Sequence, residues 1–214
     1  MKILVTGFDP FDKEKINPAY EAVKLLPDKI AGAEIIKLEI PTVFGKGADM
    51  VEKAVEAHHP DAVICVGQAG GRSCISIEKV AINLAEARIA DNEGNQPFDR
   101  AIAPDGPAAY FSTLPVKAMA ENVRANGIPS FISYTAGTFV CNDVMYRLLH
   151  LINTKYHHIK GGFIHVPYTT AQVVNKPDGT AAMDENTIAK GLQFAIEAVA
   201  LCKQSDGTAF GTTH

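Results

Sequence analysis

The sequence has no run of basic residues and no apolar stretch long enough to cross a membrane. Its 20 Lys and Arg residues are scattered singly among 24 acidic residues, for a formal net charge of −4. Nucleic-acid binding needs clustered positive charge on the protein surface, and a membrane helix needs about 20 consecutive apolar residues. We therefore expect neither nucleic acid nor a membrane as a partner.

The chain also lacks a Cys-x-x-Cys pair and a secretion signal. Its four cysteines, Cys65, Cys74, Cys141 and Cys202, are widely spaced. The start, residues 1–7, is typical of a short strand that ends in glycine, without the apolar core and cleavage site of a signal peptide. Reduced thiols and a cytoplasmic location are expected.

Metal-ligand spacing is missing as well. The pairs His58-His59 and His157-His158 stand apart from any carboxylate or cysteine cluster. The turn from Gly67 to Arg72 is glycine-rich, but it matches neither a P-loop nor a dinucleotide-binding fingerprint. We expect no metal and no cofactor.

What remains is an ordinary globular composition, 47% hydrophobic and 21% charged, in 214 residues. The predicted strands are 2–6, 34–38, 62–66, 75–83, 131–133 and 162–165. The predicted helices are 18–26, 47–58, 115–126, one that starts near Cys141, and 184–203. This alternation predicts an α/β fold, a three-layer α/β/α sandwich with a mixed, mostly parallel central sheet. Residues 1–203 should form a single catalytic domain, and residues 204–214 a disordered tail.

Two segments interrupt the alternation. Residues 86–110 are polar, rich in Gly and Pro, and without periodicity, and residues 166–183 are similar but shorter. Loops of this length in a compact domain are usually functional or disordered.

Cys141 is the best nucleophile candidate. It follows a β-prone segment and the small-residue turn Ala136-Gly137-Thr138, and Val144 and Leu148 after it have helical spacing. A helix N-terminus favours a thiolate. An inert core thiol is an equally good interpretation of this stretch alone.

His165 and Glu78 could complete a catalytic group with Cys141. His165 ends a predicted central strand, where ligands bind in open α/β sheets, and we expect the helix start at Cys141 to lie at the same edge. A nucleophile–base pair usually needs a third group that orients the imidazole, and Glu78 fits that role. On spacing alone, however, a solvated strand carboxylate paired with Lys79 or Arg72 is favoured for Glu78.

At this point the sequence resembles the pyroglutamyl peptidase I family of cysteine peptidases, over nearly its whole length. The glutamate signature is matched by Gly67-x-x-Gly70 and Ile75-Ser76-x-Glu78-Lys79-Val80-Ala81-x-Asn83. The cysteine signature is matched by Ala136-Gly137-x-Phe139-Val140-Cys141-Asn142, and the histidine segment by Phe163-Ile164-His165-Val166-Pro167.

The resemblance implies removal of N-terminal pyroglutamate from peptides, with Cys141 as nucleophile, His165 as acid/base and Glu78 orienting His165. It implies that Arg88 belongs to the oxyanion site. The substrate-binding positions that it implies are Phe8, Phe11, Asn17, Thr42, Gln68, Ile89, Phe139 and Val140. It also suggests a homotetramer, with peptides that carry N-terminal pyroglutamate as the substrates.

Two departures from the family pattern stand out. Asp12-Lys13 occupies positions where the family commonly has glycines, which affects the loop that carries Phe11. Asp143 stands where a larger His or Tyr is expected, and we predict that its carboxylate faces outward, away from a Cys141 thiolate.

Two other functions remain open at the level of sequence. A nucleoside phosphorylase-like enzyme would need a phosphate site, for which only Arg72 and Arg88 are candidates. A catalytically inactive small-ligand binder or thiol sensor would use Cys141 without turnover.

Overall fold

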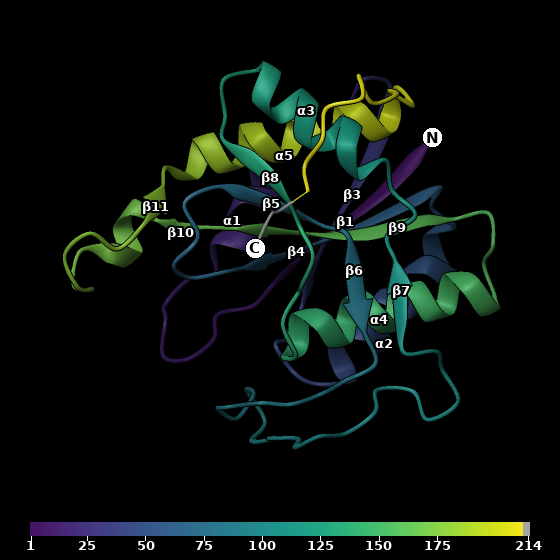
Figure 1. Ribbon diagram of the computed structural model, residues 1–214, viewed down its shortest axis with the longest axis vertical. Coiled ribbons are helices and arrows are strands. Elements are labelled where there is room, and N and C mark those ends of the chain that lie inside the picture. Colours follow the sequence, from purple (N-terminus) through teal and green to yellow (C-terminus); the bar gives the residue numbers. More distant parts are fainter. Residues whose placement is uncertain (212–214) are drawn as a thin grey trace.

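A seven-stranded sheet divides the molecule into three layers (Figure 1). The computed structural model describes residues 1–211. The strand order is β2-β3-β1-β4-β9-β5-β8, with β1 Lys2–Phe8, β2 Lys29–Ile30, β3 Ala33–Ile40, β4 Ala62–Gln68, β5 Ile75–Glu78, β8 Ser130–Ser133 and β9 Lys160–Val166. The pairs β3-β1, β1-β4, β4-β9 and β5-β8 are parallel, whereas β2-β3 and β9-β5 are antiparallel. The predicted α/β sandwich with a mixed, mostly parallel sheet is confirmed.

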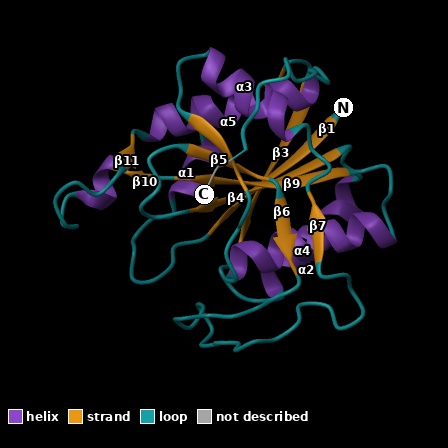
Figure 2. Ribbon diagram, in the orientation of Figure 1, coloured by secondary structure: helices purple, strands orange, loops and turns teal. Residues whose placement is uncertain are grey.

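Helices cover both faces of this sheet (Figure 2). The helices α1 (Pro18–Lys24), α3 (Val116–Ala125) and α5 (Glu185–Ala200) pack on one face, and α2 (Lys46–His58) and α4 (Val140–Thr154) on the other. Two short pairs lie outside the main sheet, β6 (Val80–Ile82) with β7 (Ala109–Phe111), and β10 (Tyr168–Thr169) with β11 (Ala182–Met183). The 3-10 helix η1 (Thr170–Val173) follows β10.

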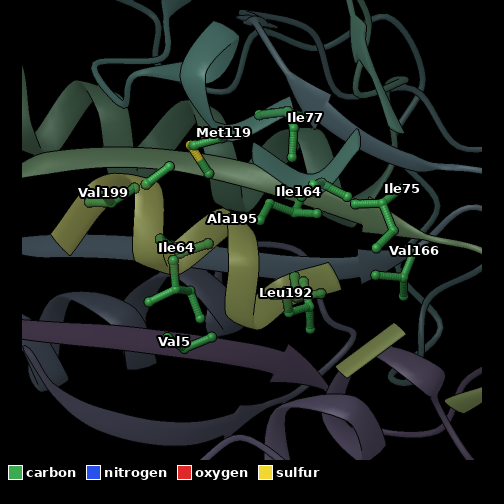
Figure 3. Packing of buried hydrophobic residues seen from close by; sticks show 14 of the residues in the cluster. Val5, Ile64, Ile75, Ile77, Met119, Ile164, Val166, Leu192, Ala195 and Val199 are labelled. Atoms are coloured by element: carbon green, nitrogen blue, oxygen red, sulfur yellow. The ribbon is translucent and has the colours of Figure 1, made fainter. Parts of the chain in front are cut away.

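The central strands are continuous apolar runs because helices cover both of their faces. Val5 and Ile64 point into the core beneath α5, where Leu192 and Ala195 meet them (Figure 3). The neighbouring residues of the same strands face the second core, under α2 and α4.

Two side chains start the helices that the sequence pattern predicts. Asn17 accepts a hydrogen bond from the amide of Ala19 at the start of α1, and Asp184 accepts one from Thr187 at the start of α5. Such N-caps contribute about 1 kcal/mol each, because they pair amides that the helix leaves without a partner.

The strand predicted over residues 75–83 is two strands. The chain leaves the main sheet at Lys79, and β6 pairs with β7 in a separate hairpin. Uninterrupted alternation predicts that Glu78, Val80 and Ile82 lie on one face of the sheet. They do not, because Val80 and Ile82 belong to the separate hairpin. This break turns the chain out of the sheet immediately after Glu78.

Cys141 lies at the predicted edge, where β9 ends, since a Cβ added to Gly67, the strand neighbour of His165, would lie 2.8 Å from Cys141 Sγ. The chain does not arrive there from the end of a strand parallel to β9, however. β8, which precedes Cys141, runs antiparallel to β9, which carries His165. Residues 134–139 bring the chain back from β8 to the start of α4 instead.

The two irregular segments differ in structure. Residues 86–108 are mostly loop, tied down by a bridge between Ala85 and Arg100 and by the buried Asp91, which accepts hydrogen bonds from the amides of Phe44 and Asn95. Residues 166–183 contain β10, η1 and β11.

The chain after Lys203 has no regular secondary structure as far as residue 211, and the Arg124 guanidinium lies 4.7 Å from the Phe210 ring centre. Residues 212–214 lie outside the described residues, so tail disorder stays a prediction, as does the single domain over 1–203. Through residue 211, every helix is too short or too polar to span a membrane.

Candidate active site

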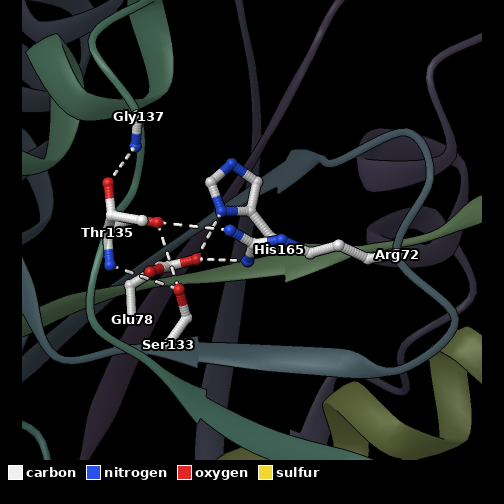
Figure 4. A network of polar contacts seen from close by, with 6 residues as sticks. All are labelled: Arg72, Glu78, Ser133, Thr135, Gly137 and His165. Carbon is white, nitrogen blue, oxygen red and sulfur yellow. Dashed lines mark hydrogen bonds and ion pairs between the residues drawn. The ribbon is translucent and has the colours of Figure 1, made fainter. Parts of the chain in front are cut away.

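Hydrogen bonds link the half-buried Arg72 to Glu78 and Glu78 to His165 (Figure 4). Glu78 Oε1 lies 2.7 Å from Arg72 Nη1 and 2.7 Å from His165 Nδ1. Glu78 is 0% exposed and His165 4% exposed. The interpretation of Glu78 as a solvated strand carboxylate is therefore wrong, although Arg72, the partner named in it, does pair with Glu78.

The ionised state of Glu78 fixes which ring nitrogen of His165 donates to it. Burial by itself would raise the pKa of Glu78, but the hydrogen bond and charge of His165, with Arg72 nearby, outweigh it and leave the pKa below its usual value. An ionised carboxylate only accepts hydrogen bonds, so His165 Nδ1 must donate. In the neutral imidazole, Nε2 is then unprotonated and can act as a base.

Arg72 also holds the segment that leads to Cys141. Its Nη2 donates to the carbonyl of Thr135 at 3.2 Å, and the Thr135 hydroxyl accepts from the amide of Gly137 at 3.1 Å. Gly137 has a φ of 80°, in the left-handed region that favours glycine. The Arg72 guanidinium therefore connects Glu78 with the turn that precedes Cys141.

Cys141 lies in the first turn of α4. Phe139 occupies the N-cap position and provides no side-chain hydrogen bond there, so no side chain caps this helix start. A Cβ added to Gly67 would lie 2.8 Å from Cys141 Sγ and 2.8 Å from Phe163 Cζ. Gly67 pairs with His165 across β4 and β9, so the thiol lies above the strand neighbour of His165.

Burial raises the pKa of Cys141 to about 12, and the nearby Glu78 carboxylate raises it too, whereas Arg72 lowers it. The helix N-terminus therefore does not suffice to ionise the thiol. A raised pKa of the thiol calls for a nearby base that can take its proton when the sulfur attacks.

The prediction that Asp143 faces outward is wrong. Asp143 is buried, and its carboxylate accepts hydrogen bonds from the amide of Gly45 and from Arg147 Nε, each at 2.9 Å. The Asp143 carboxylate thus links the start of α2, at Gly45, to Arg147 in α4. The preceding residue, Asn142, is also buried. Its side chain accepts a hydrogen bond from the amide of Ile82 and donates one to the carbonyl of Leu84.

A cavity of about 300 Å³ opens beside Cys141. Most of the predicted substrate-binding residues line it, as does the predicted oxyanion residue: Phe8, Phe11, Asn17, Thr42, Gln68, Arg88, Ile89 and Phe139. Val140 does not line it, since its side chain is fully buried in the core beneath α4. Phe11 and Phe44 each lie 5.2 Å from Phe139 between ring centres, which makes one side of the cavity aromatic.

The loop that carries Phe11 departs from the family pattern where the backbone is unusual. Asp12 and Lys13 have φ values of 52° and 64°, in the left-handed region. Glycine adopts this conformation without the steric penalty that a side chain incurs. Asp12 and Lys13 therefore hold this loop conformation at a cost in backbone strain.

Two residues at the site, Tyr168 and Gln172, were missed as functional candidates, whereas the sequence pointed to Arg72 only as a partner of Glu78 or as a phosphate ligand. Tyr168 lines the cavity and fills the space above Gly70, where an added Cβ would overlap its ring. Gln172 bonds to Gln68 across a sequence separation of 104 residues. In the sequence, Gly70 of the glutamate signature indicates that another group packs closely against the backbone there. The sequence does not indicate that this group is Tyr168.

Within residues 1–211, no group of three or more His, Cys, Asp and Glu side chains is placed to hold a metal ion.

Comparisons with known proteins identify the family. The sequence pattern described as "Pyroglutamyl peptidase" matches residues 1–202. The chain belongs to the pyroglutamyl peptidase family. It is 58% identical over 214 residues, all of both chains, to a pyrrolidone-carboxylate peptidase of Enterococcus faecalis, and 59% identical over 201 residues, 94% of each, to one of Clostridium perfringens. The crystal structure of pyroglutamyl peptidase I from Bacillus amyloliquefaciens superposes with a TM-score of 0.93 at 46% identity, covering 97% of this chain and 99% of that one.

Membership confirms the predicted family and the predicted class of enzyme, a cysteine exopeptidase that removes N-terminal pyroglutamate from peptides. Neither the phosphorylase-like alternative nor the inactive binder finds support in these relatives. The roles of individual residues do not follow from membership, and they are proposals.

Proposed function

We propose that Cys141, His165 and Glu78 form the catalytic group of this pyroglutamyl peptidase. The observation that carries the proposal is the hydrogen-bonded Arg72–Glu78–His165 chain. It holds His165 one strand away from Gly67, over which the Cys141 thiol lies. A structural role alone would not call for a charged chain that ends beside a thiol facing a cavity.

The reaction follows from the protonation states. His165 Nε2 takes the Cys141 proton as the sulfur attacks the carbonyl carbon between pyroglutamate and the next residue. The C–N bond breaks, the leaving amine receives that proton from His165, and a thioester remains on Cys141. His165 then removes a proton from water, the hydroxide attacks the thioester, and the proton returns to the sulfur as pyroglutamate leaves.

The amide of Cys141 and the side chain of Arg88 stabilise the oxyanion. A good donor of this kind is worth roughly 3–4 kcal/mol in the transition state. The uncapped first turn of α4 supports the first assignment, and the position of Arg88 at the cavity supports the second.

The flat, uncharged pyroglutamyl ring suits the aromatic side of the cavity, where Phe8, Phe11 and Phe139 lie, with Thr42 and Ile89 beside them. Gln68 and Asn17 are the polar groups proposed for the lactam, and Val140 would contribute only through its backbone. A charged N-terminal ammonium would lose its hydration in this cavity, at a cost of several kcal/mol.

Hydrolysis of a chromogenic pyroglutamyl anilide tests the assignment. Cys141→Ala should show no turnover, whereas Cys202→Ala, which removes an exposed cysteine near the C-terminus, should keep the wild-type rate. Full activity of Cys141→Ala would overturn the proposal.

A cytoplasmic location and a homotetrameric assembly are further proposals, which rest on the widely spaced cysteines and on the family resemblance. Exposed aromatic side chains at Phe98 and Phe111 are available for subunit contacts. Light scattering of the purified protein tests the assembly, and a monomer would refute it.

A further inference from the structure

Gln172 lies next to the proposed lactam ligand Gln68 but belongs to a different segment, the 3-10 helix η1. Its Oε1 lies 2.9 Å from the backbone nitrogen of Thr169, in a capping box that starts this helix. A backbone N–H can only donate, so the amide atom that faces it must be the oxygen. The backbone N–H of Thr169, which can only donate, therefore fixes the orientation of the Gln172 side-chain amide.

This orientation passes to Gln68. The Nε2 of Gln172 lies 2.9 Å from Oε1 of Gln68. Because Nε2 only donates, Gln68 must present its oxygen to Gln172 and keep its NH₂ group at the other end. Within residues 1–211, no protein acceptor bonds to that NH₂ group.

The two glutamines stand between two cavities. Gln68 lines the cavity beside Cys141, and Gln172 lines a neighbouring one of about 630 Å³; Asp12 and Ile16 border both. Asn17, the other polar candidate, accepts from the amide of Ala19 and donates to the carbonyl of Asp9 at 2.9 Å. One of the two N–H donors of Asn17 is thus used in holding the chain, whereas within residues 1–211 both donors of the Gln68 NH₂ group are free of protein acceptors, which makes Gln68 the stronger candidate.

We propose that Gln172 is a positioning residue that holds the Gln68 NH₂ group toward the substrate, so that the site selects a carbonyl acceptor, the lactam C=O of pyroglutamate. The inference rests on the proposed function of the cavity. It makes ring recognition depend on a side chain outside that cavity.

Two substitutions of Gln172 separate orientation from packing. In Gln172→Glu, one carboxylate oxygen still accepts from Thr169, and the other forces Gln68 to turn its NH₂ group away from the substrate. In Gln172→Met, the side chain keeps a similar length but imposes no orientation on Gln68. We expect KM for the pyroglutamyl anilide to rise ~3–10-fold in Gln172→Met and ~10–100-fold in Gln172→Glu, since a hydrogen bond is lost in the first and an unpaired oxygen is turned to the lactam in the second.

The value of kcat should change little in both, because the lactam bond is made equally in the ground and transition states. The inhibition constant of 2-pyrrolidone, the isolated lactam ring, should rise in parallel with KM. Asn175→Asp is the charge control: it adds a negative charge in the neighbouring cavity without being bonded to Gln68, and it should stay within about twofold of wild type.

The outcomes are distinct. If Gln172→Met impairs KM as much as the isosteric Gln172→Glu or more, Gln172 acts through packing, and the inference is overturned. An Asn175→Asp effect equal to that of Gln172→Glu would overturn it as well, because charge alone would explain the result. If both Gln172 variants match an active wild type, only this inference fails, whereas a wild type without turnover refutes the proposed function itself.

Discussion

Replacing Gly67 by alanine should impair catalysis far more than it impairs folding. The added Cβ would lie 2.8 Å from Cys141 Sγ and 2.8 Å from Phe163 Cζ. Carbon contacts are comfortable at about 3.5–4.0 Å, so a neighbour must move by about 1 Å. Phe163 is fully buried between Phe8 and His165, with ring centres 6.2 and 4.8 Å away.

Either response damages the site. If the thiol moves, the nucleophile leaves its position; if the Phe163 ring moves, it pushes against His165. A misplacement of about 1 Å costs on the order of 100-fold in rate, and overpacking costs about 1–3 kcal/mol of stability. We therefore expect kcat/KM for a pyroglutamyl anilide to fall about 100-fold in Gly67→Ala.

Gly161→Ala is the matched control. It lies on the adjacent strand β9, and its added Cβ would overlap Ile152 Cδ1 in the core beneath α4. Thermal unfolding should show a comparable loss of stability in both variants, but Gly161→Ala should keep nearly the wild-type kcat/KM. If Gly67→Ala is as active as Gly161→Ala, the placement of Cys141 over Gly67 is not the catalytic one.

Three other perturbations test separate parts of the site. Arg72→Met removes a charge that lowers the pKa of Glu78, so the acid limb of the kcat/KM–pH profile should move to higher pH; an unmoved limb would contradict the charged chain. The sign follows because the depressed pKa keeps the Glu78 carboxyl ionised at pH values below the usual 4.5, and the loss of Arg72 raises that pKa. The orientation of His165 is then lost at a higher pH as the pH falls. Since burial raises the pKa of Cys141 to about 12, its alkylation by iodoacetamide should still accelerate between about pH 7 and 10, and a plateau below pH 8 would refute the neutral thiol. Lys13→Gly should raise the free energy of unfolding by about 0.5–1 kcal/mol in denaturant titration, because glycine relieves the left-handed backbone, whereas Lys13→Ala should give no gain.

The fold could be predicted largely because its elements are strongly patterned. Unbroken apolar runs such as residues 62–66 indicate strands covered on both faces, and Asn17 and Asp184 mark helix starts by their own capping chemistry. The break at Lys79 could not be predicted this way. Alternating residues continue through it, and only the pairing of β6 with β7 shows that the chain has left the main sheet.

Charges were harder to place than apolar residues. Asp143 looked like a surface acid because its partners, the amide of Gly45 and the side chain of Arg147, depend on how α4 packs and not on its neighbours in sequence. Glu78 looked solvated for the same reason. Burial of a carboxylate depends on long-range partners, which a local pattern does not contain.

The sequence by itself determined the family, the class of chemistry and the candidate residues, because the motifs around Glu78, Cys141 and His165 are specific and the helix and strand periodicities are local properties of the chain. Only the tertiary structure decided how these residues meet. The direction of β5 and β8 against β9, the reach of Arg72 to both Glu78 and Thr135, and the contact of Gln172 with Gln68 are all set by segments distant in sequence. The burial that raises the pKa of the Cys141 thiol also arises only from packing, so the need for a nearby base is a consequence of the fold.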